Sequence, residues 1–349
     1  MGERTIVAQS HSLLLHIGPR KTGTTAIQQA MASRRDALRA HDIVYPGGGR
    51  QHFQEVNRFL GRRQFWEEDH TRSINERPWQ QLLDEVGGAR CGVISTEVLS
   101  QARQEHVGRL AASARGRTLV VVITYRPFED LLTSTWQQLV KEGLRDPLST
   151  WARAAVTDHP EQSDAPFPRI LDLATLVDIW GGVVGPENVT VVSVSRSQPH
   201  VIFDAFEELL QLPDGFLAPE TEEPGKRSLT AQEAELLRLA NTLLPRGSAT
   251  LKRQRDFRRA VSRWLDKTSA EPTGSRLALP ADVVELARDR STEMVADLQS
   301  RTPGVRVFGD LADLLKTSSY PLGDEHPPES IPTTLAAQWL ALGIKAGSE

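Results

Sequence analysis

The stretch SLLLHIGPRKTGTTAIQQ, Ser12–Gln29, contains an apolar run, a glycine-containing loop and the beginning of a helical pattern. The apolar residues of Ser12–Ile17 stop at a Gly-Pro pair, which is typical of a buried strand that ends in a loop. From Thr24 onward, apolar residues recur at helical spacing, with charged residues between them. The stretch therefore predicts a strand, a loop and a helix in direct succession.

The segment GPRKTGTT, Gly18–Thr25, has the G-x-x-x-x-G frame of a loop that binds phosphate. A loop between a parallel strand and a helix directs several backbone N–H groups at one point, and the helix dipole adds positive potential there. Glycines allow the backbone angles that such a loop needs and let an anion approach closely. These features predict an anion-binding loop, and the alternative is a tight turn without a ligand.

The usual loop for nucleoside triphosphates has a lysine directly before its last Ser or Thr, and this sequence has Thr24 there. The lysine of the segment, Lys21, lies three residues earlier. The apolar strand patterns also do not end in the aspartate that would hold Mg²⁺, because TLVVVITY runs into Arg126 and GVIST runs into Glu97. The sequence therefore lacks two parts of a typical kinase or NTPase site.

Three further stretches have the pattern of core strands, namely Cys91–Ser95, Thr118–Tyr125 and Val189–Val194. Thr118–Tyr125 is almost continuously β-branched, as expected of a strand that is buried on both faces of a parallel sheet. Helical patterns separate the strands, in Trp79–Val86, Gln104–Ala114, Phe128–Lys141, Ile170–Trp180 and Val201–Leu210. This alternation predicts an α/β fold in which a central parallel sheet is flanked by helices.

The chain of 349 residues is expected to form a single α/β domain over residues 1–349. Residues 1–11 contain no apolar segment and are expected to be flexible, and residues 318–349 form a tail whose order the sequence leaves open. A helical pattern over Thr230–Leu243 predicts that the last third is a helical extension of the same core.

Composition and charge exclude several classes of function. The formal net charge is -4 and the pI is about 6.2, which argues against a dedicated nucleic-acid-binding protein. A single cysteine, Cys91, excludes an internal disulfide and a multi-cysteine metal cluster. The apolar runs are too short to cross a membrane and no secretory signal is visible. We therefore expect a cytoplasmic protein without a nucleic-acid or membrane partner, and the sequence leaves the oligomeric state open.

The motif PRKTGTT resembles the 5′-phosphosulfate loop of the sulfotransferases that use 3′-phosphoadenosine 5′-phosphosulfate (PAPS), which has the form P-K/R-S/T-G-T-T. Bacterial members often have HKTGTT followed by a helix with glutamine, as TAIQQ is here. The resemblance implies a sulfotransferase of P-loop-like architecture in which Lys21 stabilises negative charge on the departing 3′,5′-ADP. The donor-binding residues that it implies in this loop are Arg20, Lys21, Thr22, Gly23, Thr24 and Thr25.

A second motif of this family is an arginine at the end of a core strand, followed eight residues later by a serine, and both bind the 3′-phosphate. The sequence has Arg126 and Ser134 at that spacing. An arginine can bind phosphate through two parallel hydrogen bonds, whereas the alternative for Arg126 is an ion pair with Glu129 or Asp130. The family also places a basic segment over the nucleotide, and the resemblance assigns this role to Lys226 and Arg227.

Sulfuryl transfer to a hydroxyl or amine requires a group that accepts the acceptor's proton. Glu97 follows the strand pattern of Cys91–Ser95 and is the first candidate, with a helix cap or an ion pair as the alternative. His52 is the second candidate, because a histidine in this region is common among the bacterial relatives, and its alternative is simple exposure. The histidines show no H-x-x-x-H spacing, so no zinc or other metal is expected.

The combined prediction is an enzyme that transfers a sulfuryl group from PAPS to a small-molecule or secondary-metabolite acceptor. Displacement would be direct and in line and would release 3′,5′-ADP without a metal. A small-molecule kinase with a P-loop is the first alternative. The second is a non-enzymatic protein that binds a nucleotide.

Overall fold

The computed structural model of the chain describes residues 11–61, 74–158, 166–195, 197–219, 228–243, 256–257, 260–261, 264, 274–301, 304–316, 322–323, 327–328 and 330–346. Residues 1–10, most of the segment expected to be flexible, lie outside this range. Part of the 318–349 tail is described and contains a helix, α14 (Thr333–Ala346).

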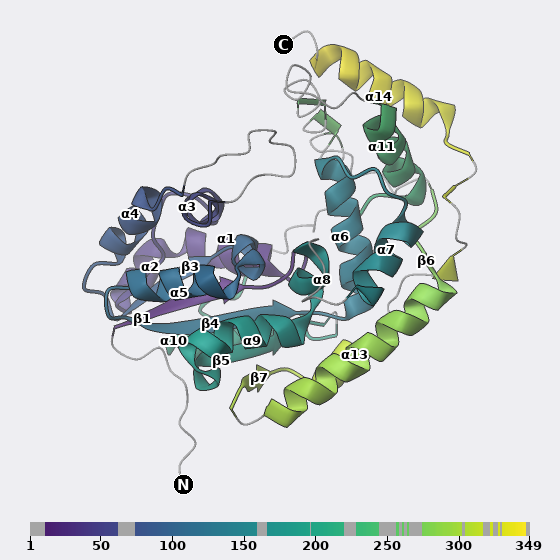
Figure 1. The fold of residues 1–349 in the computed structure, drawn as a ribbon. Coiled ribbons are helices and arrows are strands. Elements are labelled where there is room, and N and C mark those ends of the chain that lie inside the picture. The colour runs from purple at the N-terminus through teal and green to yellow at the C-terminus, as the bar shows by residue number, and fades with distance from the viewer. Residues whose placement is uncertain are drawn as a thin grey trace.

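The centre of the molecule is a six-stranded sheet in the order β2-β3-β1-β4-β5-β7, and all of its neighbouring strands are parallel (Figure 1). Its strands are β1 (Ser12–Ile17), β2 (Ile43–Val44), β3 (Cys91–Ser95), β4 (Thr118–Tyr125), β5 (Val189–Ser193) and β7 (Arg306–Phe308). The predicted α/β class with a parallel sheet is confirmed. The four predicted strands are present, and β5 ends one residue earlier than its pattern predicts.

Helices cover both faces of this sheet (Figure 1). Side chains alternate between the faces along each strand, so Leu14 packs with α1, α2 and α10, whereas Leu13 and Leu15 pack with the helices of the other face. The helices are α1 (Thr24–Ser33), α2 (Arg35–Ala40), α3 (Phe53–Phe59), α4 (Arg77–Val86), α5 (Gln104–Ser113), α6 (Phe128–Glu142), α7 (Leu148–Thr157), α8 (Pro166–Leu171), α9 (Leu173–Val184), α10 (Val201–Leu210), α11 (Ala231–Leu243), α13 (Ala281–Arg301) and α14.

Short elements complete the fold. They are the 3-10 helices η1 (Glu97–Gln101), η2 (Pro186–Asn188) and η3 (Leu311–Leu315), and a second, two-stranded sheet of β6 (Leu279–Pro280) and β8 (Leu322–Gly323). Within the described ranges, no helix is both long enough and apolar enough to cross a membrane.

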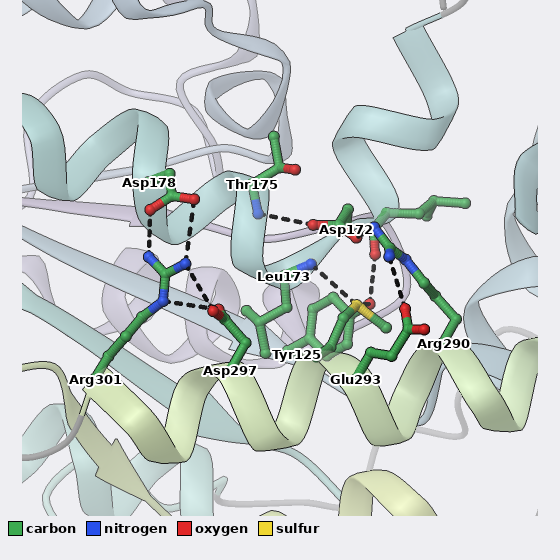
Figure 2. Close-up of polar contacts among 11 residues, drawn as sticks. Tyr125, Asp172, Leu173, Thr175, Asp178, Arg290, Glu293, Asp297 and Arg301 are labelled. Carbon is green, nitrogen blue, oxygen red and sulfur yellow. Dashed lines mark hydrogen bonds and ion pairs between the residues drawn. The ribbon is translucent and has the colours of Figure 1, made fainter. Parts of the chain in front are cut away.

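The long helix α13 is attached to α9 by two arginines (Figure 2). Arg290 forms an ion pair with Asp172, which also caps α9 by accepting a hydrogen bond of 2.7 Å from the backbone N–H of Thr175. Arg301 pairs with Asp178, two turns further along α9. Between them, the sulfur of Met294 accepts a hydrogen bond from the backbone of α9. These contacts join α13 to the core.

Candidate functional site

Three of the predicted site segments directly follow neighbouring strands at one edge of the sheet. The anion-binding loop follows β1, Glu97 comes just after β3, and Arg126 comes directly after β4. Because β3, β1 and β4 are adjacent and parallel, their carboxyl ends lie side by side. Open α/β sheets bind ligands at this edge.

The loop between β1 and α1 has a backbone that is held in unusual conformations. Lys21 has φ 70° and Gly23 has φ 85°, so both lie in the left-handed region. The hydroxyl of Thr22 is fully buried and donates a hydrogen bond of 2.8 Å to the carbonyl of Pro19, which closes the loop. The Lys21 side chain is exposed above this closed turn.

Gly18 is required because β4 lies directly beside it. A Cβ at this position would lie 2.5 Å from the backbone oxygen of Thr124 and 2.6 Å from its hydroxyl oxygen. The loop therefore leaves β1 in close contact with the backbone of β4, and only glycine fits there.

The loop ends at the N-terminus of α1, with Gly23 as the N-cap. No side chain within the described ranges caps this end, and the first turn contains no acidic residue. The first backbone N–H groups of a helix have no partner inside the helix, so this end attracts an anion. Thr24 is buried and Thr25 is exposed at the same end. The loop thus ends at a helix N-terminus without a side-chain cap, and anion binding there stays a prediction.

Arg126 connects the end of β4 to this loop. One of its terminal nitrogens donates a hydrogen bond of 2.9 Å to the carbonyl oxygen of Lys21, and the other lies 2.9 Å from a carboxylate oxygen of Asp130. The ion pair with Asp130, which was the alternative for Arg126, is therefore present together with the contact to the loop. The Nε of Arg126 is buried and has no hydrogen-bond partner among the residues that the structure describes.

One side of α6 faces the loop. Asp130, Ser134, Gln138 and Glu142 follow one another at intervals of four residues, which places them on the same side of the helix. Asp130 binds Arg126 at one end of this row, and Glu142 forms an ion pair with Arg20 of the loop at the other end. Ser134 lies between them and is 9% exposed, and its hydroxyl donates to the backbone carbonyl of Leu131 at 3.3 Å.

Glu97 is the first residue of η1, just beyond the end of β3. The hydroxyl of Thr96 caps this short helix by accepting a hydrogen bond of 3.3 Å from the N–H of Val98. The Glu97 side chain is partly exposed, and within the described part of the chain its carboxylate has no hydrogen bond or ion pair. The carboxylate is therefore accessible to an incoming molecule at the edge of the sheet.

His52 is buried, with 2% of its surface exposed. Its Nδ1 accepts a hydrogen bond of 3.0 Å from the N–H of Ser95, so the ring proton is on Nε2, which donates at 2.8 Å to the carbonyl of Pro46. Burial lowers the pKa of the imidazole. In this arrangement both ring nitrogens bind the backbone, and His52 holds the segment before α3 against the end of β3.

Lys226 and Arg227, the predicted basic segment, lie outside the described residues. In the described ranges, no three His, Cys, Asp or Glu side chains are grouped as a metal ion would require.

Two site residues were not predicted from the sequence: Glu142 as the partner of Arg20, and Thr124 beneath the loop. Asp130 was named from the sequence only as an alternative ion-pair partner of Arg126, and the structure contains that ion pair. The four-residue spacing along α6 indicates that Asp130 and Glu142 lie on the same side of the helix, so the sequence contains a signal for both acids. Thr124 has no comparable signal, because its role depends on the contact between β4 and the loop.

No protein-family model matches this chain, and no curated protein matches it. Among solved structures, the chain is similar to the crystal structure of a sulfotransferase from Alicyclobacillus acidocaldarius. The two chains are 20% identical, the match covers 70% of this chain and 99% of that chain, and the TM-score is 0.42. The fold class assigned above rests on the sheet topology of this chain alone.

Proposed function

We propose that this protein is a sulfotransferase that uses PAPS as donor and transfers its sulfuryl group to a hydroxyl or amine of a small-molecule acceptor. The observation that carries the proposal is the hydrogen bond of 2.9 Å between Arg126 and the carbonyl of Lys21. It brings the two motifs, which lie more than 100 residues apart in the sequence, into one site. One motif suits a 5′-phosphosulfate and the other suits a 3′-phosphate.

The loop would hold the 5′ end of the donor. The free N–H groups at the start of α1, with the hydroxyls of Thr24 and Thr25, would bind the 5′-phosphate. Lys21 would stabilise the negative charge that develops on the departing 3′,5′-ADP. Arg20 is paired with Glu142, so its contribution is to hold the loop against α6 as well as to add positive potential.

Arg126 and Ser134 would hold the 3′-phosphate. Arg126 is fixed by Asp130 and by the loop, and its buried Nε has no hydrogen-bond partner among the described residues. Ser134 lies one helical turn beyond Asp130 on the same side of α6. A phosphate with two negative charges would compete favourably for the Arg126 guanidinium, because charge-assisted hydrogen bonds are the strongest kind.

Glu97 would accept the proton of the acceptor as the sulfuryl group is transferred. Its carboxylate lies after the strand next to the loop strand and is accessible. We assign His52 to positioning rather than to proton transfer, since both of its nitrogens are occupied by backbone groups. The sulfuryl group would pass directly from the donor to the acceptor oxygen or nitrogen, with no covalent intermediate on the enzyme.

A thermal-shift panel with 3′,5′-ADP, 5′-ADP, ATP and GTP tests this proposal. A ligand at 100 times its Kd stabilises the folded state by about 2.7 kcal/mol, which gives a measurable rise in Tm. We expect the largest rise with 3′,5′-ADP, and turnover with labelled PAPS in a screen of hydroxyl and amine acceptors. A larger rise with ATP in the presence of Mg²⁺ would identify a kinase instead, and binding of 3′,5′-ADP without any turnover would favour a non-enzymatic binding protein.

A further inference from the structure

A chain of buried polar side chains runs beneath the anion-binding loop. The imidazole of His16, in the middle of the sheet, contacts the hydroxyl of Ser95 on β3 at 2.8 Å and the hydroxyl of Thr124 on β4 at 3.2 Å. The Thr124 hydroxyl lies 2.9 Å from the hydroxyl of Thr22 in the loop. The Thr22 hydroxyl in turn donates to the carbonyl of Pro19.

The direction of these hydrogen bonds follows from the last of them. A carbonyl can only accept, so Thr22 donates to Pro19 and must accept from Thr124. The Thr124 hydroxyl has then used its proton and accepts from Nε2–H of His16. Its other acceptor, the carbonyl of Ile17, is more distant at 3.4 Å.

His16 is 1% exposed, and its ring also packs edge-on against Phe206 with the ring centroids 4.9 Å apart. Burial lowers the pKa of the imidazole to about 3, so the ring is neutral at neutral pH. A neutral imidazole that donates through Nε2 accepts through Nδ1, and here it accepts from the hydroxyl of Ser95. His16, Thr124 and Thr22 thus each donate one hydrogen bond and accept one within the chain, and Ser95 donates at its end.

We infer that His16 is a positioning residue whose Nε2–H, acting through Thr124 and Thr22, holds the loop in its anion-binding shape. The strained φ of 70° at Lys21 lies directly before the buried Thr22, which this chain fixes from below. Arg126 fixes the Lys21 carbonyl from the other side. The loop is therefore in its binding conformation before the anion arrives, and the affinity for the anion does not have to offset the cost of ordering it.

The chain also links the loop to the segment that carries Glu97. Ser95, which donates to His16, is two residues before Glu97, and its backbone N–H binds His52. The inference rests on the proposed function only in that the loop is taken to bind the phosphate end of a donor.

Two pairs of matched variants test the role of His16. His16→Gln keeps an N–H donor near the position of Nε2, whereas His16→Asn places its shorter amide near Nδ1, where its donor does not reach Thr124. Thr124→Ser keeps the hydroxyl. Thr124→Val replaces the hydroxyl by a methyl group in a side chain of nearly the same shape, so it should disturb the fold less than His16→Asn. We expect His16→Asn and Thr124→Val to weaken binding of 3′,5′-ADP about 10-fold, and their partners to stay within about 3-fold of wild type, as expected for the loss of one buried hydrogen bond.

The same titrations with inorganic pyrophosphate separate this inference from the proposed function. The wild type could show no preference for 3′,5′-ADP while His16→Asn and Thr124→Val bind pyrophosphate more weakly than the wild type does. That result would support the loop inference and reject the PAPS proposal. Wild-type affinity for both ligands in Thr124→Val would overturn the inference. Imidazole nitrogen NMR of the wild type gives a readout that needs no ligand, because the inference requires a proton on Nε2 and none on Nδ1 at neutral pH.

Discussion

At the scale of single residues, the shape of the loop depends on how closely it approaches β4. Gly18 lies against the backbone of Thr124, whereas a Cβ at Gly23 would meet only side-chain carbons of Ile202 and Val194, at 3.5 and 3.6 Å. The two glycines therefore serve different purposes. Gly18 allows a close approach of two backbones, and Gly23 allows a left-handed backbone conformation.

This difference gives a prediction for two alanine variants. Gly18→Ala forces the loop away from β4 and should lower the free energy of unfolding by about 3 kcal/mol, the upper end of the range for overpacking. Gly23→Ala meets no clash and should cost only about 1 kcal/mol for its left-handed φ. Urea denaturation of both variants measures these values. Equal stability of the two would contradict the contact between the loop and β4.

The proposed role of Glu97 predicts a selective loss of turnover. Glu97→Gln should lower kcat roughly 100-fold or more, as expected for loss of a general base, and should leave the affinity for 3′,5′-ADP unchanged. Glu105→Gln is the matched control, because Glu105 lies on α5 with a side chain that is 74% exposed. Steady-state kinetics with PAPS and isothermal titration with 3′,5′-ADP provide the two readouts. Full activity of Glu97→Gln would remove this residue from the mechanism.

The buried His16 predicts a dependence of stability on pH. Its pKa is about 3 in the folded protein and near 6.5 in the unfolded chain, so the unfolded chain binds an extra proton between these values. The free energy of unfolding should therefore fall as the pH is lowered, by roughly 2 kcal/mol between pH 6.5 and pH 5 for this residue. Burial lowers the pKa of His52 too, which adds to the fall in the same direction.

Urea denaturation at pH 7 and pH 5 measures this effect, with His16→Gln as the comparison. The variant should lose less stability than the wild type between the two pH values. The same loss in both proteins would mean that His16 does not stay neutral in the folded state.

At the scale of elements, the ion pairs between α13 and α9 hold the C-terminal helices on the core (Figure 2). The Asp172 side chain is 4% exposed and both caps α9 and pairs with Arg290. Asp172→Ala leaves Arg290 without this partner and α9 without its cap, and should cost roughly 3 kcal/mol of stability. Asp36→Ala, on an exposed side chain of α2, should change stability by less than about 0.5 kcal/mol. Thermal or urea denaturation measures both variants. If Asp172→Ala lost as little stability as Asp36→Ala, the ion pair with Arg290 would not hold α13 on the core.

The elements that the sequence predicts well are those with a strong local pattern. The strands β1, β3 and β4 are found within their predicted bounds, because each is a continuous apolar run buried on both faces. The edge strand β7 was not predicted, since three partly exposed residues carry no pattern of their own and pair only because β5 lies beside them. The helix α13 was also not predicted, and many of its polar residues bind partners on other elements.

The site shows the same division. The loop and the two motif residues Arg126 and Ser134 could be named from the sequence because they match short motifs of the family that the sequence resembles, and their binding roles stay predictions. The partner of Arg20 could not, since its ion pair with Glu142 joins residues 122 positions apart. His52 was predicted as a candidate base, and only the structure places both of its nitrogens against backbone groups.

At the scale of the whole molecule, the order of the strands creates the site. Because β3, β1 and β4 are adjacent, Glu97, the loop and Arg126 meet at one edge although they are spread over more than 100 residues. The helix α6 contacts the loop through the ion pair of Glu142 with Arg20, and its Asp130 pairs with Arg126, which donates to the carbonyl of Lys21. We propose that this edge binds one nucleotide by both its 5′ and its 3′ phosphate.

Isothermal titration of wild type and Arg126→Ala with 3′,5′-ADP and 5′-ADP tests that claim most directly, with Arg39→Ala on the exposed side of α2 as the control. The wild type and the control should bind 3′,5′-ADP about 10- to 100-fold more tightly than 5′-ADP, as expected for one or two charge-assisted hydrogen bonds to the extra phosphate. In Arg126→Ala this preference should fall to near one. Equal affinity of the wild type for the two nucleotides, or an undiminished preference in Arg126→Ala, would contradict the account.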